Sequence, residues 1–340
     1  LDGSAVAAAT IREVETPIST GGGSNAVHPR IRAVASGDLH VVWESTNGGP
    51  VEYMKVDTDG MLLNGPVALG GVASGADLPD VDVDTNGHAH IVFGNVAPQM
   101  LESQVYYAMV DGDPAAPIPV PIAPTLLTLD DDLRAGSATV NVDTFDNTLY
   151  IVFTQALINQ ANGAEEIFLA RLNPALDDRN GDAADPAVLK VSEQQITAGE
   201  GLYQWRVTSH IGSDSRIHAT YIDFNQGNCS APYSIIDRHI TFAGKTIAIN
   251  TLTTNGSAPN CDPQARGAPG RNRIVWTDDS GSTPEIWSDT FTRADAGDSG
   301  LTCSLRNRNA TGWQSGDLWL LFAAIAGLGV WRRYGKRYGA

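Results

Sequence analysis

One sequence unit recurs five times in this chain, and this repetition limits the possible folds more than any other feature. The first copy runs from His28-Pro29-Arg30-Ile31 through Gly37-Asp38-Leu39-His40-Val41-Val42-Trp43 to residues 51–57. The second copy repeats this order over residues 78–112, and Gly87-His88-Ala89-His90-Ile91-Val92-Phe93 forms its centre. A repeat of this length predicts a chain built from one small structural unit.

The three later copies are more divergent, but they keep the order of the segments. They occupy residues 140–169, 216–237 and 262–287. An aromatic residue ends the central segment of every copy, and these residues are separated by 50, 60, 68 and 55 positions: Trp43, Phe93, Phe153, Tyr221 and Trp276.

Each unit is typical of a small antiparallel sheet. Three short apolar runs are joined by Gly, Asp and Asn turns, and a fourth run follows at 66–69 and 186–191. Because alternate side chains of a strand point to opposite faces, such a sheet must be covered on both sides by its neighbours. The sequence therefore predicts an all-β fold, a five-bladed β-propeller over residues 11–292, preceded by an extension over 1–10. The run near 11–19 is expected to add the last strand to the fifth blade and to close the ring.

Composition agrees with an all-β fold and excludes one class of partner. The chain has 35 glycines and 18 prolines, and no long amphipathic helical pattern precedes residue 312. Residues 1–317 hold 18 basic and 39 acidic side chains, a net charge of −21, because the last four basic residues follow Asp317. Such an acidic surface repels a polyanion, so nucleic acid is not an expected partner.

The repeat resembles exported bacterial propeller proteins, whose units are similar to those of sialidases. The resemblance rests on His-Pro-x-Ile, Gly-x-x-His-Val-Val-Trp and Glu-Ile-x-Tyr elements, which are found here at 28–31, 37–43 and, in altered form, 285–287. It covers roughly residues 11–291 and implies a propeller in an extracytoplasmic location. The Ser-x-Asp-x-Gly-x-Thr-Trp box and the arginine triad of sialidases have no clear counterparts, so the resemblance does not carry over the enzymatic activity.

The end of the chain differs from the repeats. Residues 293–311 form a polar linker, residues 312–332 are predicted to be a transmembrane helix, and 333–340 a basic cytoplasmic tail. The predicted anchor combines apolar residues, interfacial tryptophans and two terminal arginines: Trp313, Leu318, Trp319, Leu320, Leu321, Phe322, Ile325, Leu328, Val330, Trp331, Arg332 and Arg333. The lipid bilayer and integral membrane subunits are the partners that this segment suggests.

Two alternatives remain for this segment. It could be a buried helix of a soluble domain, although a helix that is apolar on all sides and ends in Arg-Arg fits a membrane better. It also resembles bacterial C-terminal sorting signals, which are cleaved during maturation, and cleavage would then fall near Cys303. We favour a retained anchor that holds the propeller on the periplasmic or cell-surface side of a bacterial membrane.

Three groups of residues are candidates for metal binding. An acidic loop offers Asp178, Asn180, Asp182 and Asp185 as oxygen ligands for Ca²⁺, and a solvated loop is the alternative. A second acidic stretch, 82–87, lacks the glutamate that would complete a calcium loop and is interpreted as a turn. His40, His90 and His218 occupy equivalent positions, with Tyr150 and Arg273 in the other copies. Such equivalence favours a repeated structural hydrogen bond over a metal-binding ring.

Two cysteines and the start of the chain are relevant to whether the protein is exported. Cys229 and Cys261 lie in loop-like sequence on either side of a strand-rich stretch, so a disulfide between them is plausible. The chain opens at Leu1 without an apolar signal segment, which suggests that a leader is missing from it.

No serine elbow, Cys/His pair or phosphate-binding glycine loop was found. The first hypothesis is therefore a non-enzymatic, membrane-anchored propeller that serves as a scaffold or accessory subunit of a larger membrane complex, with no cofactor besides possible Ca²⁺. The alternative is a surface propeller that binds or hydrolyses glycans, and it predicts an exposed pair of carboxylates at the axis.

Overall fold

The described residues of the computed structural model form β-strands arranged in five antiparallel sheets. The structure describes residues 26–45, 49–69, 76–95, 104–110, 124–128, 135–156, 165–173, 189–198, 203–224, 233–256, 265–267, 273–278 and 285–290. All structural statements below concern these residues.

Four of the sheets have four strands each, and consecutive strands pair with one another. The first two sheets contain β1 (Val27–Ala33), β2 (Leu39–Glu44), β3 (Val51–Val56), β4 (Leu62–Ala68), and β5 (Ala76–Val83), β6 (Ala89–Asn95), β7 (Gln104–Val110), β8 (Thr125–Leu126). The third and fourth contain β9 (Ala135–Val142), β10 (Leu149–Ala156), β11 (Glu165–Leu172), β12 (Lys190–Gln195), and β13 (Tyr203–Ile211), β14 (Ile217–Phe224), β15 (Tyr233–Ile240), β16 (Thr246–Gly256). The fifth consists of β17 (Ala265–Gly267), β18 (Arg273–Asp278) and β19 (Glu285–Thr290).

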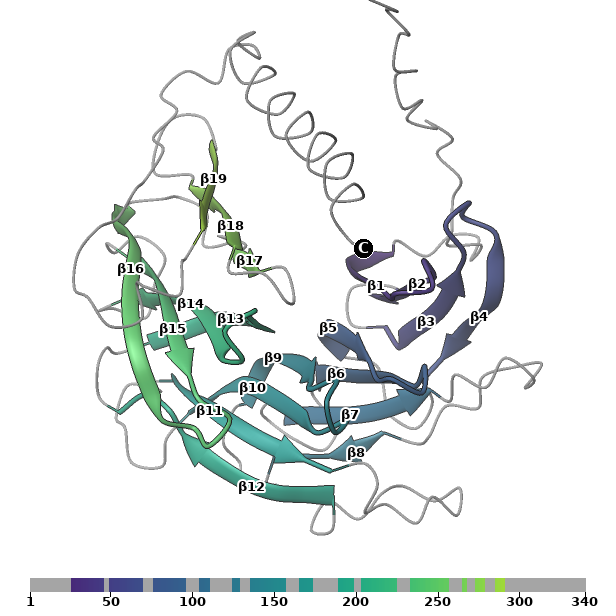
Figure 1. Cartoon of the computed structure of the whole chain (residues 1–340), viewed down its shortest axis with the longest axis horizontal. Helices are drawn as coiled ribbons and strands as arrows, with labels where there is room; N and C mark the ends of the chain where they lie inside the picture. The colour runs from purple at the N-terminus through teal and green to yellow at the C-terminus, as the bar shows by residue number, and fades with distance from the viewer. Residues whose placement is uncertain are drawn as a thin grey trace, which may run out of the picture.

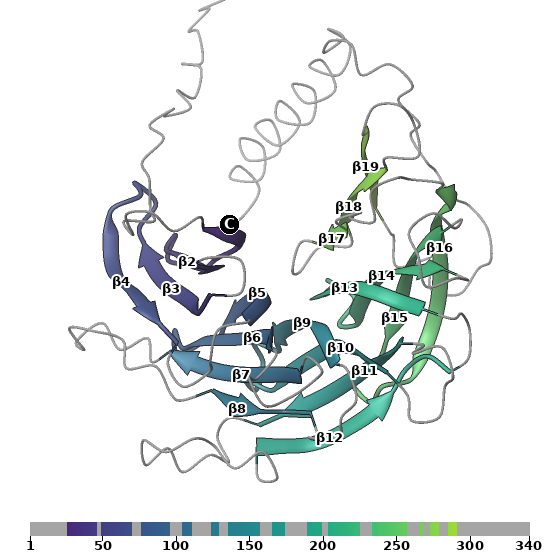
Figure 2. The ribbon, with the colours of Figure 1, turned by 180° about the vertical axis from the view of Figure 1, so that it is seen from behind.

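The five sheets are arranged as the blades of a propeller. Figures 1 and 2 show the first strand of every sheet (β1, β5, β9, β13 and β17) nearest the middle, and the later strands follow outward. Each sheet packs against the next: β5 lies against β1 and β2, β9 against β5 and β6, and β17 against β13 and β14. The prediction of an all-β propeller is confirmed by this arrangement.

Apolar side chains fill the spaces between neighbouring blades. One cluster joins the second and third blades through Val92, Tyr107 and Phe153, and a second joins the first and second through Val42 and Phe93. A third cluster connects the third and fourth blades, with Val152 packed near Tyr221. The central strands β6 and β10 are therefore buried on both faces, as the consecutive apolar residues in each repeat predict.

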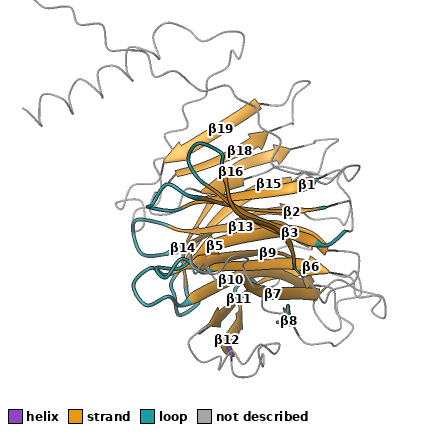
Figure 3. Cartoon of the chain, turned by 90° about the vertical axis from the view of Figure 1, so that its right-hand side faces the viewer, coloured by secondary structure: helices purple, strands orange, loops and turns teal. Residues whose placement is uncertain are grey.

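Tight turns join the first and second strands of each of the first four blades. Gly37 and Gly87 lie in two of them with φ angles of 96° and 86°, a region that glycine enters without steric cost. In both turns the glycine N–H donates to the carbonyl of the residue three positions earlier, Val34 or Asp84. Figure 3 shows that most of the described loops gather on one side of the molecule.

The same irregularity recurs in the innermost strand of four blades. The pairing register shifts at the start of β1, β5, β9 and β13, which marks a β-bulge in each. One residue in each bulge has a positive φ without being glycine, between 45° and 51°: His28, Leu78, Ser137 and Arg206. Such residues cost of order 1 kcal/mol or more each and are concentrated at functional sites.

Several sequence-based predictions concern parts of the chain outside the described residues. These are the extension 1–10, the closing strand near 11–19, the linker 293–311, the helix 312–332 and the tail 333–340. Among the residues that the structure does describe, no helix is long and apolar enough to span a membrane.

The packing between blades predicts a large difference between two phenylalanines of the third blade. Phe153 is 1% exposed and Phe145 is 94% exposed. We expect Phe153→Ala to lower the free energy of unfolding by about 3–5 kcal/mol because it opens a cavity between two blades. Phe145→Ala should change it by less than about 0.5 kcal/mol. Denaturant titration of both variants checks this, and equal effects would contradict the packing described here.

Candidate functional site

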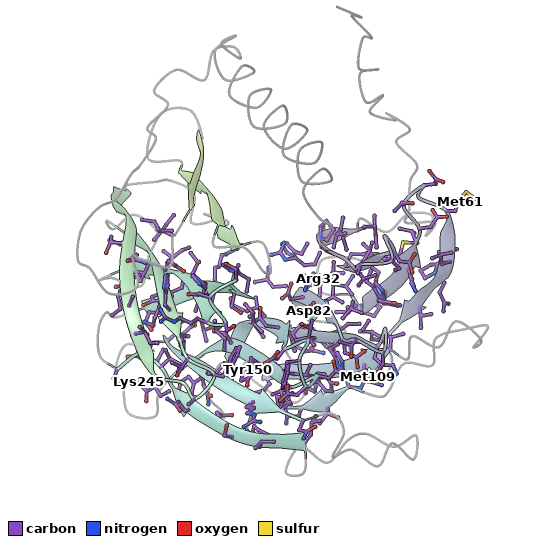
Figure 4. All side chains as sticks on the ribbon, viewed as in Figure 1. Arg32, Met61, Asp82, Met109, Tyr150 and Lys245 are labelled. Atoms are coloured by element: carbon purple, nitrogen blue, oxygen red, sulfur yellow. The ribbon has the colours of Figure 1, made fainter. Side chains whose placement is uncertain are left out.

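Polar side chains connect the innermost strands where these surround the middle of the propeller. Arg32 of β1 forms an ion pair with Asp82 of β5, with Nε 2.6 Å from Oδ1. The other oxygen of Asp82 accepts a hydrogen bond from the backbone N–H of Val142 in β9, at 2.8 Å. Figure 4 shows Arg32 and Asp82 side by side near the middle of the ribbon. Three successive blades are thus linked by one carboxylate.

The environment of Asp82 changes its acidity. Burial raises the pKa of this carboxyl to about 6, although the Arg32 charge and the backbone N–H groups of Val142 and Val83 act in the opposite direction. Asp80, two residues earlier on β5, accepts a hydrogen bond from the Val140 N–H at 3.1 Å. Both aspartates are buried. They are therefore not the exposed carboxylate pair that the glycan hypothesis predicted.

A different carboxylate lies at the opposite end of the innermost strands, where two bulges meet. Glu44, the last residue of β2, has an exposed fraction of 0%. Its Oε1 is 2.7 Å from Nδ1 of His28 and accepts a hydrogen bond from the Leu78 N–H at 3.0 Å. His28 and Leu78 are the positive-φ residues of the first and second blades. Glu44 therefore holds both bulges together at the junction of these blades.

The second oxygen of Glu44 is a point of difference from Asp82, because both oxygens of Asp82 have partners. Oε2 is buried and has no hydrogen-bond partner among the described residues. Buried carboxylate oxygens are normally paired, and the described residues do not supply a partner for this one. Glu44 is as buried as the two aspartates, whereas the His28 side chain beside it is 36% exposed and is the part of this junction that reaches solvent. The arrangement can accept a hydrogen bond from a hydroxyl or transfer a proton.

Sequence reasoning did not single out Glu44. The signal is present in the alignment of the repeats. Glu44 directly follows the aromatic residue of the central segment, and the equivalent residues in the other four blades are Gly94, Thr154, Ile222 and Thr277. A charged residue at an otherwise uncharged repeat position is the feature that could have revealed it.

The predicted ring of equivalent residues lies away from the innermost strands. His40, His90, Tyr150 and His218 are all on the second strand of their blades. Nδ1 of His40 is 2.9 Å from the hydroxyl of Tyr53, and Nδ1 of His90 is 2.8 Å from that of Tyr107. A repeated structural hydrogen bond is thus confirmed for the first two blades.

The remaining predicted site residues lie outside the described residues. They comprise the calcium-loop residues Asp178, Asn180, Asp182 and Asp185, the cysteines 229 and 261, and the anchor residues of 312–332. Their roles stay predictions.

No known protein family and no curated protein matches the chain by its sequence. Solved structures do resemble it. An α-L-arabinofuranosidase from Lactobacillus brevis superposes with a TM-score of 0.49 at 14% identity, over 79% of this chain and 92% of the other. A thermostable family-43 glycoside hydrolase gives 0.48 at 16% identity, over 80% and 92%. A Hadza microbial sialidase gives 0.46 at 11% identity, over 74% and 55%. A puromycin hydrolase is also similar, with a TM-score of 0.44 at 14% identity, over 74% and 36%.

These comparisons correct the first functional hypothesis. The non-enzymatic scaffold or accessory subunit of a membrane complex is wrong, because the structural neighbours include arabinan-degrading enzymes and a sialidase. At this level of identity the likeness concerns the fold, so the functional argument has to rest on the site.

The buried His40–Tyr53 pair predicts a specific response to acid. Burial, and secondarily the charge of Lys55, lowers the pKa of His40 from 6.5 to about 4, with Asp38 opposing this shift. The unfolded chain therefore binds a proton at a higher pH than the folded one, and folding stability is lost as the pH falls from about 6.5 to 4. His40→Gln should remove this part of the pH dependence.

The measurement is the free energy of unfolding of both proteins at several pH values between 4 and 7. The advantage of wild type over His40→Gln should shrink as the pH falls, whereas a constant difference would show that His40 does not remain neutral in the folded state.

Proposed function

We propose that this chain is a glycan-hydrolysing propeller whose substrate meets the junction of the first two blades at Glu44. The observation that carries the proposal is the buried Oε2 of Glu44, which has no hydrogen-bond partner among the described residues, while Oε1 is fixed by His28 and Leu78. This geometry leaves one carboxylate oxygen for a substrate hydroxyl or glycosidic oxygen.

Hydrolysis of a glycosidic bond suits this arrangement. In most glycosidases one carboxylic acid protonates the leaving oxygen, and a second carboxylate activates water or attacks the sugar. Glu44 is assigned to one of these two roles. His28 holds the carboxylate through Oε1, so it acts as a positioning residue. The Leu78 N–H adds a second fixed bond to the same oxygen, which limits rotation of the Glu44 side chain.

The proposal predicts that Glu44→Gln abolishes most of the hydrolysis while glycan binding persists. Glutamine is nearly the same size and can still accept the Leu78 hydrogen bond, but it cannot donate or take up the catalytic proton. We expect kcat/KM to fall by about 100-fold or more. Reducing-sugar release should be followed on a panel that includes arabinofuranosyl and sialyl substrates, the sugars acted on by the enzymes named above.

Glu52 of β3 supplies a matched control, since it is a glutamate of the same blade at the same end. Burial raises the pKa of Glu52, with the Trp43 side chain opposing the shift. Glu52→Gln should retain full activity. If neither the wild-type chain nor the variants bind or hydrolyse any member of a broad polysaccharide panel, the proposal is wrong.

We also propose that the propeller is exported and held at the outer face of a bacterial membrane by residues 312–332. The apolar run, the flanking tryptophans and the basic end support this location. A surface location would place the propeller where extracellular polysaccharides are found. We further propose that the acidic loop at Asp178–Asp185 binds Ca²⁺ and that Cys229 and Cys261 form a disulfide. Both features suit an extracytoplasmic protein.

Removal of residues 312–340 tests the anchor. The full chain, expressed with a secretion leader in a bacterium, should sediment with membranes and resist extraction by alkaline carbonate. The truncated chain should be released in soluble form with unchanged hydrolytic activity. Release of the full chain by carbonate would contradict a transmembrane anchor, and a mass matching cleavage near Cys303 would identify a sorting signal.

A further inference from the structure

Three histidines lie next to one another within the fourth blade, at the opposite end of the innermost strands from Glu44. His210 of β13 pairs with His218 of β14, which in turn pairs with His239 of β15. All three are buried. Ring centroids are 4.8 Å apart for His210 and His218 and 4.0 Å apart for His218 and His239. The propeller repeat does not require such a row.

The fourth blade departs from the repeat at the residue that supports the central histidine. In the first two blades a tyrosine of the third strand, Tyr53 or Tyr107, bonds to the histidine of the second strand. This tyrosine lies two positions before the third-strand residue that pairs with the histidine. The equivalent residue in the fourth blade is Asp237. The neutral hydroxyl is thus replaced by a carboxylate whose exposed fraction is 0%.

Asp237 contacts two of the histidines at once. Its Oδ2 is 2.8 Å from Nε2 of His239 and 3.6 Å from Nδ1 of His218. Asn250 is also near this group, with Nδ2 3.2 Å from Nε2 of His239. A carboxylate on one nitrogen of an imidazole is the usual support for a histidine whose other nitrogen binds a metal. Asp237 would orient both rings in this way.

A third side chain completes a set of metal ligands. Asp214, in the turn between β13 and β14, has Oδ1 3.2 Å from Nε2 of His218. One ligand atom each from Asp214, His218 and His239 lies within 4.8 Å of the others. Two ligands about 2.1 Å from one tetrahedral ion are about 3.4 Å apart, so the Asp214–His218 separation already fits. Arg216 Nε is 3.9 Å from the other oxygen of Asp214.

We propose that Asp214, His218 and His239 bind a Zn²⁺ ion, with Asp237 as the orienting carboxylate. Two imidazoles and one carboxylate form a ligand set that suits zinc and other first-row transition metals, whereas Ca²⁺ and Mg²⁺ prefer oxygen ligands throughout. The fourth position would be filled by water. Because this set lies in the fourth blade and Glu44 ends β2 of the first blade, we assign the ion no part in the proposed hydrolysis, and its role is to join β14, β15 and the turn that holds Asp214.

Zinc binding to the full chain tests this proposal directly. Protein treated with a chelator and then exchanged into metal-free buffer should bind one equivalent of Zn²⁺ with sub-micromolar affinity, measured by competition with a chromophoric chelator. Added Co²⁺ should give the visible absorption of a tetrahedral site with nitrogen and oxygen ligands. The zinc-loaded chain should also melt about 2–5 °C higher.

Variants separate a specific site from surface binding. Asp214→Asn changes a turn residue and should fold normally, yet lose the equivalent of Zn²⁺. Asp237→Asn should weaken binding about 10–100-fold without changing the stoichiometry. His90→Gln alters an equally buried histidine at the equivalent position of the second blade, and it should bind as tightly as the wild type. Failure of the wild type to bind zinc, or equal binding by Asp214→Asn, would overturn the proposal.

Discussion

The fold of this chain depends on the burial of both faces of each sheet between neighbouring sheets. A four-stranded sheet with apolar side chains on both faces cannot be stable alone, and here the clusters around Phe93, Phe153 and Tyr221 belong to two blades each. The free energy gained from burying this surface is therefore shared between consecutive repeats. The second, third and fourth blades each lie between two others and share apolar contacts with both neighbours or with one of them.

This packing also determines where polar chemistry can occur. The innermost strands of neighbouring blades lie around the middle of the propeller. These strands belong to different sheets, so some of their backbone N–H groups bond to side chains of a neighbouring blade. Asp80 and Asp82 accept hydrogen bonds from two such N–H groups of β9, and Glu44 accepts one from β5. Asp80 and Asp82 therefore connect the second blade to the third. Glu44 differs because one of its oxygens remains without a described partner beside a half-exposed histidine.

Much of the architecture could be predicted from the sequence because the repeat carries it. The apolar runs that end at Trp43, Phe93 and Phe153 lie in the second strands of their blades, β2, β6 and β10. The turns at Gly37 and Gly87 lie between strands, as expected. The candidate sites were harder to predict for two reasons. Glu44 and Leu78 are 34 residues apart and meet only through packing between blades. The histidine row requires the register of β13, β14 and β15, which places His210 and His239 on either side of His218.

A crystal structure of the Glu44→Gln chain soaked with an oligosaccharide that the wild type cleaves would test whether the substrate binds at Glu44. We expect an intact sugar at the junction of the first two blades, with a hydroxyl or glycosidic oxygen within hydrogen-bond distance of residue 44. A sugar bound elsewhere on the propeller, with the junction filled by protein side chains alone, would contradict it.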